Sequence, residues 1–218
     1  MTDAESTPAG EEPVPLNLVP KQALRRRARS VAVAAVIVGV AFGGIVGLFA
    51  GRWPGLLVAL AIAVPLVLLA LSESRRRTWL DGHIVVARAM GTRRVDLHRA
   101  ERVDLLVTQA RGTRTVGLLV VGAPEHKTIN IAVASYSGVG GAELDILALR
   151  KLADALAGAQ DTRGLVFSEL LVAVLRSEAR GDGLEDRPLY RLVSMVGERG
   201  LARKVHADAV SKFVTTLD

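Results

Sequence analysis

The chain of 218 residues contains no cysteine, and only 4% of its residues are aromatic. Without cysteine there is no disulfide framework, no thiolate metal site and no cysteine nucleophile. The four histidines are scattered at positions 83, 98, 126 and 206, which leaves little material for a histidine metal centre. We therefore name no catalytic, cofactor-binding or metal-binding residue from the sequence, and we expect a protein that is not an enzyme.

Charge is missing from two long apolar stretches near the N-terminus. Residues 31–51 carry no charge, and as a helix they extend about 31 Å, the thickness of the hydrocarbon core of a bilayer. A second uncharged run covers residues 54–72 after Arg52. The alternative, two buried helices of a soluble core, is disfavoured because both runs are bounded by arginines. The sequence predicts a transmembrane hairpin over residues 21–77, with spans at about 31–51 and 54–72.

The basic residues that bound the two runs indicate the orientation of the hairpin. The connection between the runs carries the single Arg52, whereas eight basic residues lie at their outer ends: Lys21, Arg25, Arg26, Arg27, Arg29, Arg75, Arg76 and Arg77. The positive-inside rule then predicts a multi-pass protein of the inner cell membrane with both termini in the cytoplasm. Most of the net charge of +6 is accounted for here, so we expect no nucleic-acid partner, which would need a basic stripe across the folded part.

Small residues recur every four positions along both predicted spans. They are Gly39, Gly43, Gly47 and Gly51 in the first span and Gly55, Ala59 and Ala63 in the second. Small residues on one helix face let two backbones approach closely. Two alternatives follow: the faces meet inside one hairpin, or the glycine face joins subunits into a homo-oligomer. The spans contain no charged residue that could line a transport path, which argues against a transporter.

After residue 77 the pattern changes to short alternating runs. Period-two alternation of β-branched residues predicts half-buried antiparallel strands, here over 84–89, 94–98, 102–108, 116–120 and 129–133. An apolar stripe at helical spacing predicts a helix over 142–157. Residues 78–158 therefore read as an α+β region of about five strands followed by one helix.

The residues of this region resemble a known family. Trp79-Leu80-Asp81-Gly82, then a strand and Gly91, then Arg94-Val95-Asp96-Leu97 and Arg102-Val103-Asp104-Leu105, resemble bacterial pleckstrin-homology-like (PH-like) domains. The whole chain is also similar to two-span actinobacterial membrane proteins. The resemblance implies a PH-like antiparallel β barrel or sandwich capped by a helix. It also implies a non-enzymatic binding or scaffolding role, and it carries over no functional residues.

The two ends of the chain are expected to lie outside this domain. Residues 1–20 are acidic and rich in proline, which predicts a disordered tail. Residues 160–218 predict a separate helical segment, in which 165–175 is too short to span a membrane and packs against protein. A hinge at 180–186 precedes a helix that starts at Asp186-Arg187-Pro188. The last helix is amphipathic, and its apolar face requires cover from the domain, from another tail helix or from a partner.

Arginines gather in the first strands. Each exposed arginine beside an anionic leaflet contributes about 1 kcal/mol of attraction. One hypothesis is therefore an anionic-lipid face, and the alternative is a set of cross-strand ion pairs on a solvated surface. The candidate lipid-binding residues are Arg75, Arg76, Arg77, Arg88, Arg93, Arg94, Arg99 and Arg102.

These observations favour a membrane-anchored, non-catalytic scaffold or binding module that presents a PH-like domain at the cytoplasmic face. Its expected partners are membrane lipid with anionic headgroups and a protein that the sequence does not identify. The alternative is an oligomeric channel or transport-accessory subunit assembled through the glycine-rich face of the first span.

Overall fold

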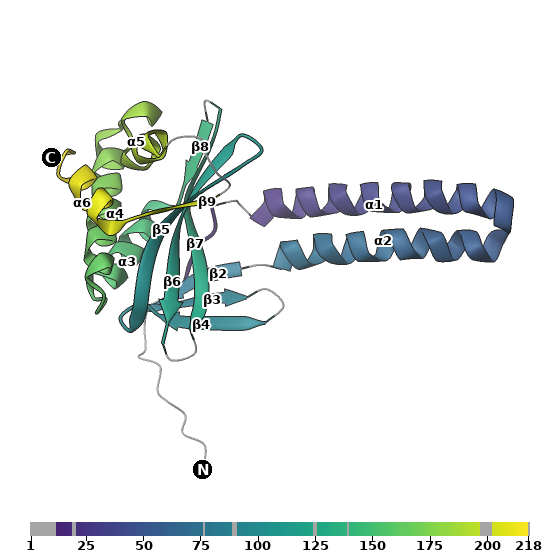
Figure 1. The fold of residues 1–218 in the computed structure, drawn as a ribbon, viewed down its shortest axis with the longest axis horizontal. Coiled ribbons are helices and arrows are strands. Elements are labelled where there is room, and N and C mark those ends of the chain that lie inside the picture. Colours follow the sequence, from purple (N-terminus) through teal and green to yellow (C-terminus); the bar gives the residue numbers. More distant parts are fainter. Residues whose placement is uncertain are drawn as a thin grey trace, which may run out of the picture. The chain divides into compact units, whose positions relative to one another are not determined.

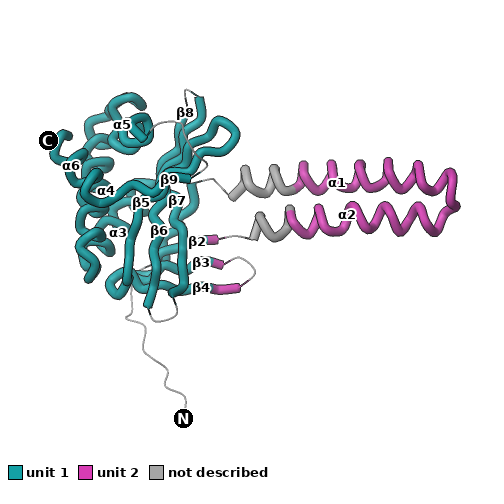
Figure 2. Tube along the Cα trace, viewed as in Figure 1, with its two compact units in different colours: residues 1–18, 78–87, 93–218 teal, residues 19–77, 88–92 magenta. Residues whose placement is uncertain are grey.

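The computed structural model describes residues 12–18, 21–75, 77–88, 91–123, 126–138, 140–196 and 202–217, without the side chains of 21–28 and 70–75. The chain divides into two compact units (Figure 2). One comprises residues 1–18, 78–87 and 93–218, and the other comprises residues 19–77 and 88–92.

The second unit contains a helical hairpin of α1 (Lys21–Ala50) and α2 (Arg52–Arg75) (Figure 1). The single residue between the helices is Gly51, whose φ of +93° is a conformation that favours glycine. The stretches Arg29–Ala50 and Arg52–Leu69 are long and apolar enough to cross a membrane. Two long apolar helices are therefore present where the sequence predicts them.

The first unit contains two antiparallel sheets. The four-stranded sheet has the order β1-β2-β3-β4, with β1 at Val14–Pro15, β2 at Arg77–Asp81, β3 at Ile84–Arg88 and β4 at Thr92–Asp96. The five-stranded sheet has the order β8-β7-β6-β5-β9. Its strands are β5 (Ala100–Ala110), β6 (Thr113–Gly122), β7 (Lys127–Ser137), β8 (Gly140–Glu143) and β9 (Ala202–Val205). All five predicted strands are present, but the sheets do not close into a barrel.

Among its described residues, this unit also contains four α-helices and one 3₁₀ helix. They are α3 (Ile146–Ala157), α4 (Thr162–Arg180), η1 (Leu184–Asp186), α5 (Pro188–Met195) and α6 (Ala207–Val214). The α-helices lie together on one side of the strands (Figure 1). Side chains from both sheets and from α3 to α6 form one hydrophobic core. The coarse prediction of an α+β region is confirmed.

The N-terminal segment differs from the expectation of disorder at residues 12–18. Val14 and Leu16 are buried in the core, β1 pairs with β2, and the Leu16 N–H donates to the Thr78 carbonyl at 2.9 Å. Val14, Leu16 and Leu18 alternate with polar residues or proline, which is a strand pattern. The acidic and proline-rich composition of the surrounding residues nevertheless predicts disorder. The folded unit therefore includes a strand that precedes the hairpin.

The C-terminal segment also differs from the prediction, because it is not a separate body. Strand β9 pairs with β5 at the edge of the five-stranded sheet, and Phe167 of α4 is fully buried. Val210 and Phe213 of α6 are buried in the same core, so the apolar face of the last helix is covered by the chain itself. Residues 165–175 pack against protein, as predicted.

Two helix starts differ from their predicted positions. The helix predicted from residue 142 begins at Ile146, because Gly140–Glu143 pairs with β7 as β8 and the Asp145 side chain caps α3 by accepting from the Leu147 N–H. The α5 helix starts at Pro188, as expected, but its N-cap is Arg187 and not Asp186. Both shifts reflect tertiary contacts and caps that periodicity alone does not reveal.

Candidate functional site

The small residues of the two long helices face each other inside the hairpin. A Cβ placed on Gly43 would lie 2.6 Å from the Cβ of Ala59 and 2.6 Å from the carbonyl oxygen of Gly55. A Cβ on Gly39 would lie 2.9 Å from the Cβ of Ala63. Real Cβ atoms do not approach so closely, so only glycine allows this helix spacing. Gly39, Gly43 and Gly47 therefore pack against α2 within the same chain, whereas Gly51 lies between the two helices and a Cβ placed on it meets no atom within 4 Å.

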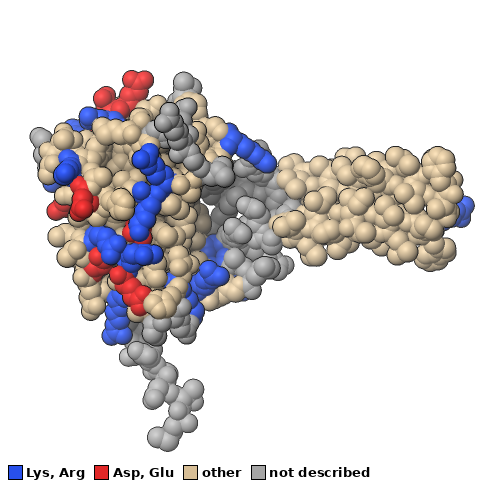
Figure 3. All heavy atoms as spheres, in the orientation of Figure 1, with Lys and Arg blue, Asp and Glu red and all other residues tan. Residues whose placement is uncertain are grey.

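The opposite faces of the hairpin are apolar and uncovered. Leu48 and Phe49 are 86% and 89% exposed, and Ile37 is 63% exposed. On the face that Figure 3 shows, the apolar part of the hairpin displays no charged side chain apart from a basic one at its tip; Arg29 lies at the start of the apolar stretch of α1, and Arg52 begins α2. This surface is consistent with membrane spans, since large exposed apolar patches mark membrane or protein interaction sites.

The candidate lipid-binding arginines are brought together in part. Arg77 begins β2, Arg88 ends β3, and Arg93 and Arg94 lie near the start of β4. Because neighbouring strands run antiparallel, these ends belong to one end of the four-stranded sheet. All four side chains are exposed, and so is Arg99 in the turn before β5. Arg76 lies outside the described residues, as does the side chain of Arg75.

These arginines lack acidic partners in the part of the chain that the structure describes. The Arg93 guanidinium donates to the Thr128 carbonyl at 3.4 Å, and no ion pair is seen there for Arg88, Arg94 or Arg99. The hypothesis of an anionic-lipid face requires arginines without acidic partners. The alternative of cross-strand ion pairs requires that each arginine has an acidic partner. Arg102 behaves differently and belongs to a separate network.

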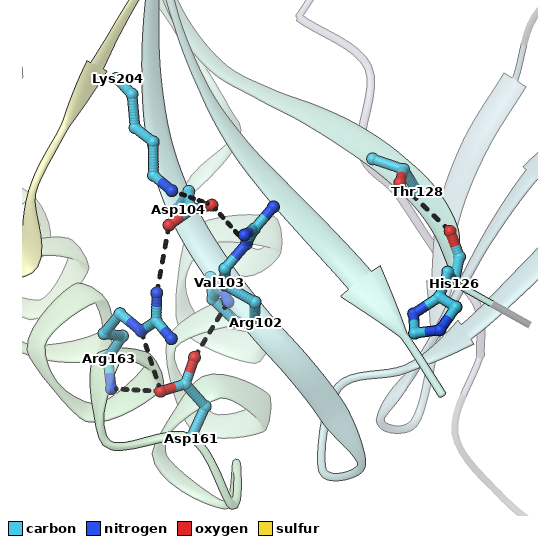
Figure 4. A network of polar contacts seen from close by, with 8 residues as sticks. All are labelled: Arg102, Val103, Asp104, His126, Thr128, Asp161, Arg163 and Lys204. Atoms are coloured by element: carbon cyan, nitrogen blue, oxygen red, sulfur yellow. Dashed lines mark hydrogen bonds and ion pairs between the residues drawn. The ribbon is translucent and has the colours of Figure 1, made fainter. Parts of the chain in front are cut away.

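That network is centred on Asp104, which is only 3% exposed. Its carboxylate lies 2.9 Å from Arg102 Nε, 2.7 Å from Lys204 Nζ and 3.4 Å from Arg163 Nη1 (Figure 4). Because these partners come from β5, β9 and α4, the aspartate ties three elements together. Asp104 and Arg102 are thus structural ion-pair residues at the junction of sheet and helices.

Asp161 extends the same network to the N-terminus of α4. Its carboxylate accepts the backbone N–H of Val103 at 3.0 Å, and it accepts both the N–H and the Nε of Arg163 at 3.1 Å (Figure 4). A carboxylate at this position satisfies free helix N–H groups and favours the helix dipole. The network holds the start of α4 against β5. Most of its polar groups pair with other groups of the network.

An open pocket of about 300 Å³ lies near β8, lined by Tyr136, Gly141, Glu143, Asp182, Leu184 and Arg187. The Tyr136 hydroxyl donates to the Glu143 carboxylate, and burial together with this carboxylate raises the pKa of Tyr136. Arg187 lies 3.0 Å from Glu143 and 2.7 Å from Glu178. The polar groups of the pocket thus pair with each other.

Two of the scattered histidines meet in space. The rings of His83 and His98 stack with centroids 4.6 Å apart and planes at 10°, and His83 Nε2 lies 3.8 Å from Asp96 Oδ2. The other Asp96 oxygen accepts the His98 N–H at 2.9 Å, and the Leu97 N–H donates to the His83 carbonyl at 2.9 Å. A ligating atom from each of the two imidazoles and the carboxylate lies within 4.8 Å of the others.

Sequence reasoning missed this cluster. The strand predicted over 94–98 includes His98, but β4 ends at Asp96 and His98 lies in the following turn. The usable signal is the hairpin itself: His83 precedes β3 and His98 follows β4, at nearly equal distances from the turn. Folding the two strands against each other brings both histidines to the same end.

Comparison with known proteins adds no identification, because no family model, no curated protein and no solved structure matches the chain.

Proposed function

We propose that this chain is an integral membrane protein with two spans that holds a non-catalytic binding module at the cytoplasmic face. The observation that carries the proposal is the hairpin, whose apolar side chains point outward along 22- and 18-residue stretches. Transfer of this surface into lipid is favourable, since about 25 cal/mol is gained for each Å² of apolar surface removed from water. Only a bilayer offers such cover on every outer side of two helices.

The arrangement of basic residues supports an orientation with both termini inside. Eight lysines and arginines lie at the outer ends of the apolar runs, against Arg52 between them. Lysine and arginine near span ends are retained on the cytoplasmic side. This orientation places both the N-terminal strand β1 and the remainder of the folded unit in the cytoplasm, where they can pair.

The free arginines support contact with anionic headgroups. Helix α2 ends at Arg75 and β2 begins at Arg77, so the covalent chain keeps the first residue of the sheet within about 7 Å of the helix end. This distance is below the Debye length of about 8 Å at physiological salt. Arg88, Arg93 and Arg94 share that end of the sheet, and each contributes about 1 kcal/mol near an anionic surface.

We infer further that the α+β region is a PH-like scaffold or binding domain. Two successive antiparallel sheets followed by α3 support this assignment, although β1 and β9 are additions and the sheets remain open. The self-paired polar groups around Tyr136 support a non-catalytic role. No observation on the described residues favours the channel or transport-accessory alternative, because the glycine face already packs against α2.

The lipid contact is tested with the full chain reconstituted in vesicles. Thr92→Cys supplies the only thiol, and a fluorophore attached there is quenched by headgroup-labelled lipid when the arginine end lies on the membrane. We expect stronger quenching in vesicles with phosphatidylglycerol than in pure phosphatidylcholine, and loss of the difference at high salt.

Matched variants make this test specific. Replacement of Arg88, Arg93 and Arg94 by glutamine removes three charges from the arginine end and should abolish the lipid dependence. Replacement of three exposed arginines elsewhere, Arg111, Arg150 and Arg191, removes the same charge and should leave it intact. Equal quenching in both lipids at low salt, or equal loss in both triple variants, contradicts the lipid contact.

A further inference from the structure

We propose that His83, Asp96 and His98 form a binding site for a divalent transition metal ion of the zinc type. Two imidazole nitrogens and one carboxylate oxygen are a donor set that suits Zn²⁺, and the chain offers no thiolate that would favour a softer ion. Three protein ligands leave a fourth position for water or an exogenous ligand. The site lies wholly within the folded unit and is independent of the membrane proposal.

The distances fit an open site that closes on the ion. In a tetrahedral zinc site with bonds of about 2.0–2.1 Å, ligand atoms lie about 3.4 Å apart. His83 Nε2 and Asp96 Oδ2 are already 3.8 Å apart, and all ligating atoms of the set lie within 4.8 Å of one another. Because stacked rings cannot both direct a nitrogen at one tetrahedral ion, we expect one imidazole to turn out of the stack on binding.

The backbone holds the three residues in register before any ion binds. Asp96 Oδ1 accepts the His98 N–H, which leaves Oδ2 directed at His83. The Leu97 N–H donates to the His83 carbonyl, and the Gln160 N–H donates to the His98 carbonyl at 3.0 Å. Ligands held on paired strand ends lose less conformational freedom on binding than ligands on unsupported loops.

The end of α3 supplies a second, independent feature that favours a cation. A Cβ on Gly158, the C-cap of α3, would lie 2.5 Å from His98 Nε2, so the imidazole rests directly on the C-terminus of this helix. The unpaired carbonyls at a helix C-terminus carry partial negative charge. Glycine at this position also leaves the space that the His98 ring occupies.

Metal binding is measured on the full chain in detergent, purified without an oligohistidine tag. Titration calorimetry with Zn²⁺ should show one equivalent bound per chain. Cu²⁺ as a spectroscopic probe should show hyperfine coupling to two imidazole nitrogens in electron paramagnetic resonance. His83→Gln, His98→Gln and Asp96→Asn should each weaken Zn²⁺ binding by about 100-fold, and the two histidine variants should lose one coupled nitrogen each.

Two further variants separate ligation from general damage. His126→Gln removes an exposed histidine that pairs with Glu101 and should leave binding unchanged. Gly158→Ala keeps all three ligands but displaces His98, and it should weaken binding by about tenfold. Trp79 fluorescence and the melting temperature without metal verify folding of each variant.

The outcomes decide the proposal in either direction. Loss of binding in the three ligand variants with folding retained supports it. Absence of Zn²⁺ binding by the folded wild type overturns it, as do wild-type affinities in the His83 and His98 variants or a loss in His126→Gln alone. If a ligand variant fails to fold, the Gly158→Ala result and the number of coupled nitrogens in the wild type decide.

Discussion

A single glycine in the hairpin provides the sharpest test of how the two long helices pack. A Cβ on Gly43 would lie 2.6 Å from the Cβ of Ala59, whereas carbon atoms in contact lie about 3.5–4.0 Å apart. Even alanine at this position must therefore separate the helices by about 1 Å. Leucine must push the axes toward the spacing of about 8–10 Å that ordinary side chains impose. We expect Gly43→Leu to destabilise the hairpin by about 1–3 kcal/mol.

The neighbouring residue supplies a matched control. A Cβ on Gly44 meets no atom within 4 Å, so Gly44→Leu should leave the hairpin unchanged. Spin labels on cysteines at Val33 and Leu68, both about 60% exposed, are the only thiols in the chain and report the helix separation by electron–electron double resonance. Gly43→Leu should lengthen or broaden this distance. An unchanged distance, combined with loss of cross-linked oligomers in membranes, would show that the glycine face joins subunits and refute the packing described here.

Three further predictions concern the folded unit, measured as urea unfolding of the full chain in detergent, with Trp79 fluorescence as the signal in a Trp53→Phe background. Leu16→Ala should lower the free energy of unfolding by about 2–5 kcal/mol because Leu16, which follows β1, is buried in the core, whereas Pro13→Ala at an exposed site should lower it by less than about 0.5 kcal/mol; equal losses contradict the burial of this N-terminal segment. Asp104→Asn should cost about 1–3 kcal/mol, less than a fully buried pair because its cations are 38–49% exposed, and the exposed Asp154→Asn serves as control. The raised pKa of Tyr136 stabilises the fold fully below about pH 10, the ordinary pKa of tyrosine. This stabilisation is then lost at about 1.4 kcal/mol for each pH unit above that value. Tyr136→Phe should lack that part of the decline, and identical profiles for both proteins rule the effect out.

The sequence predicts those features that depend on local periodicity. The two long apolar helices follow from uninterrupted apolar runs, and β3 to β7 follow from alternation of β-branched residues. The strands β1 and β9 have four residues or fewer, and they exist because a distant strand offers an unpaired edge. For Val14, whose neighbours are acidic residues and prolines, composition predicts disorder and not a strand. Short edge strands of this kind depend on tertiary context and not on propensity.

The same distinction applies to the candidate sites. The four-residue spacing of small residues is visible in the sequence, but only the structure shows that these residues pack against each other inside the hairpin. Arg102 looks like its neighbours in a list of arginines, but its partner Asp104 is buried by contacts with α4 and β9. His83 and His98 are separated by two strands, so their proximity requires the hairpin register. Sites whose residues come from different strands and helices therefore cannot be predicted from sequence patterns alone.

The central claim is that two apolar helices cross the membrane with the folded unit on the cytoplasmic side. Because the chain has no cysteine, single cysteines at Arg52 and Arg111 report the side of the membrane directly. In intact bacterial cells, a membrane-impermeant maleimide should label Arg52→Cys, whereas Arg111→Cys should react only after the inner membrane is permeabilised. Labelling of Arg111→Cys from outside, or protection of Arg52→Cys until permeabilisation, contradicts the account.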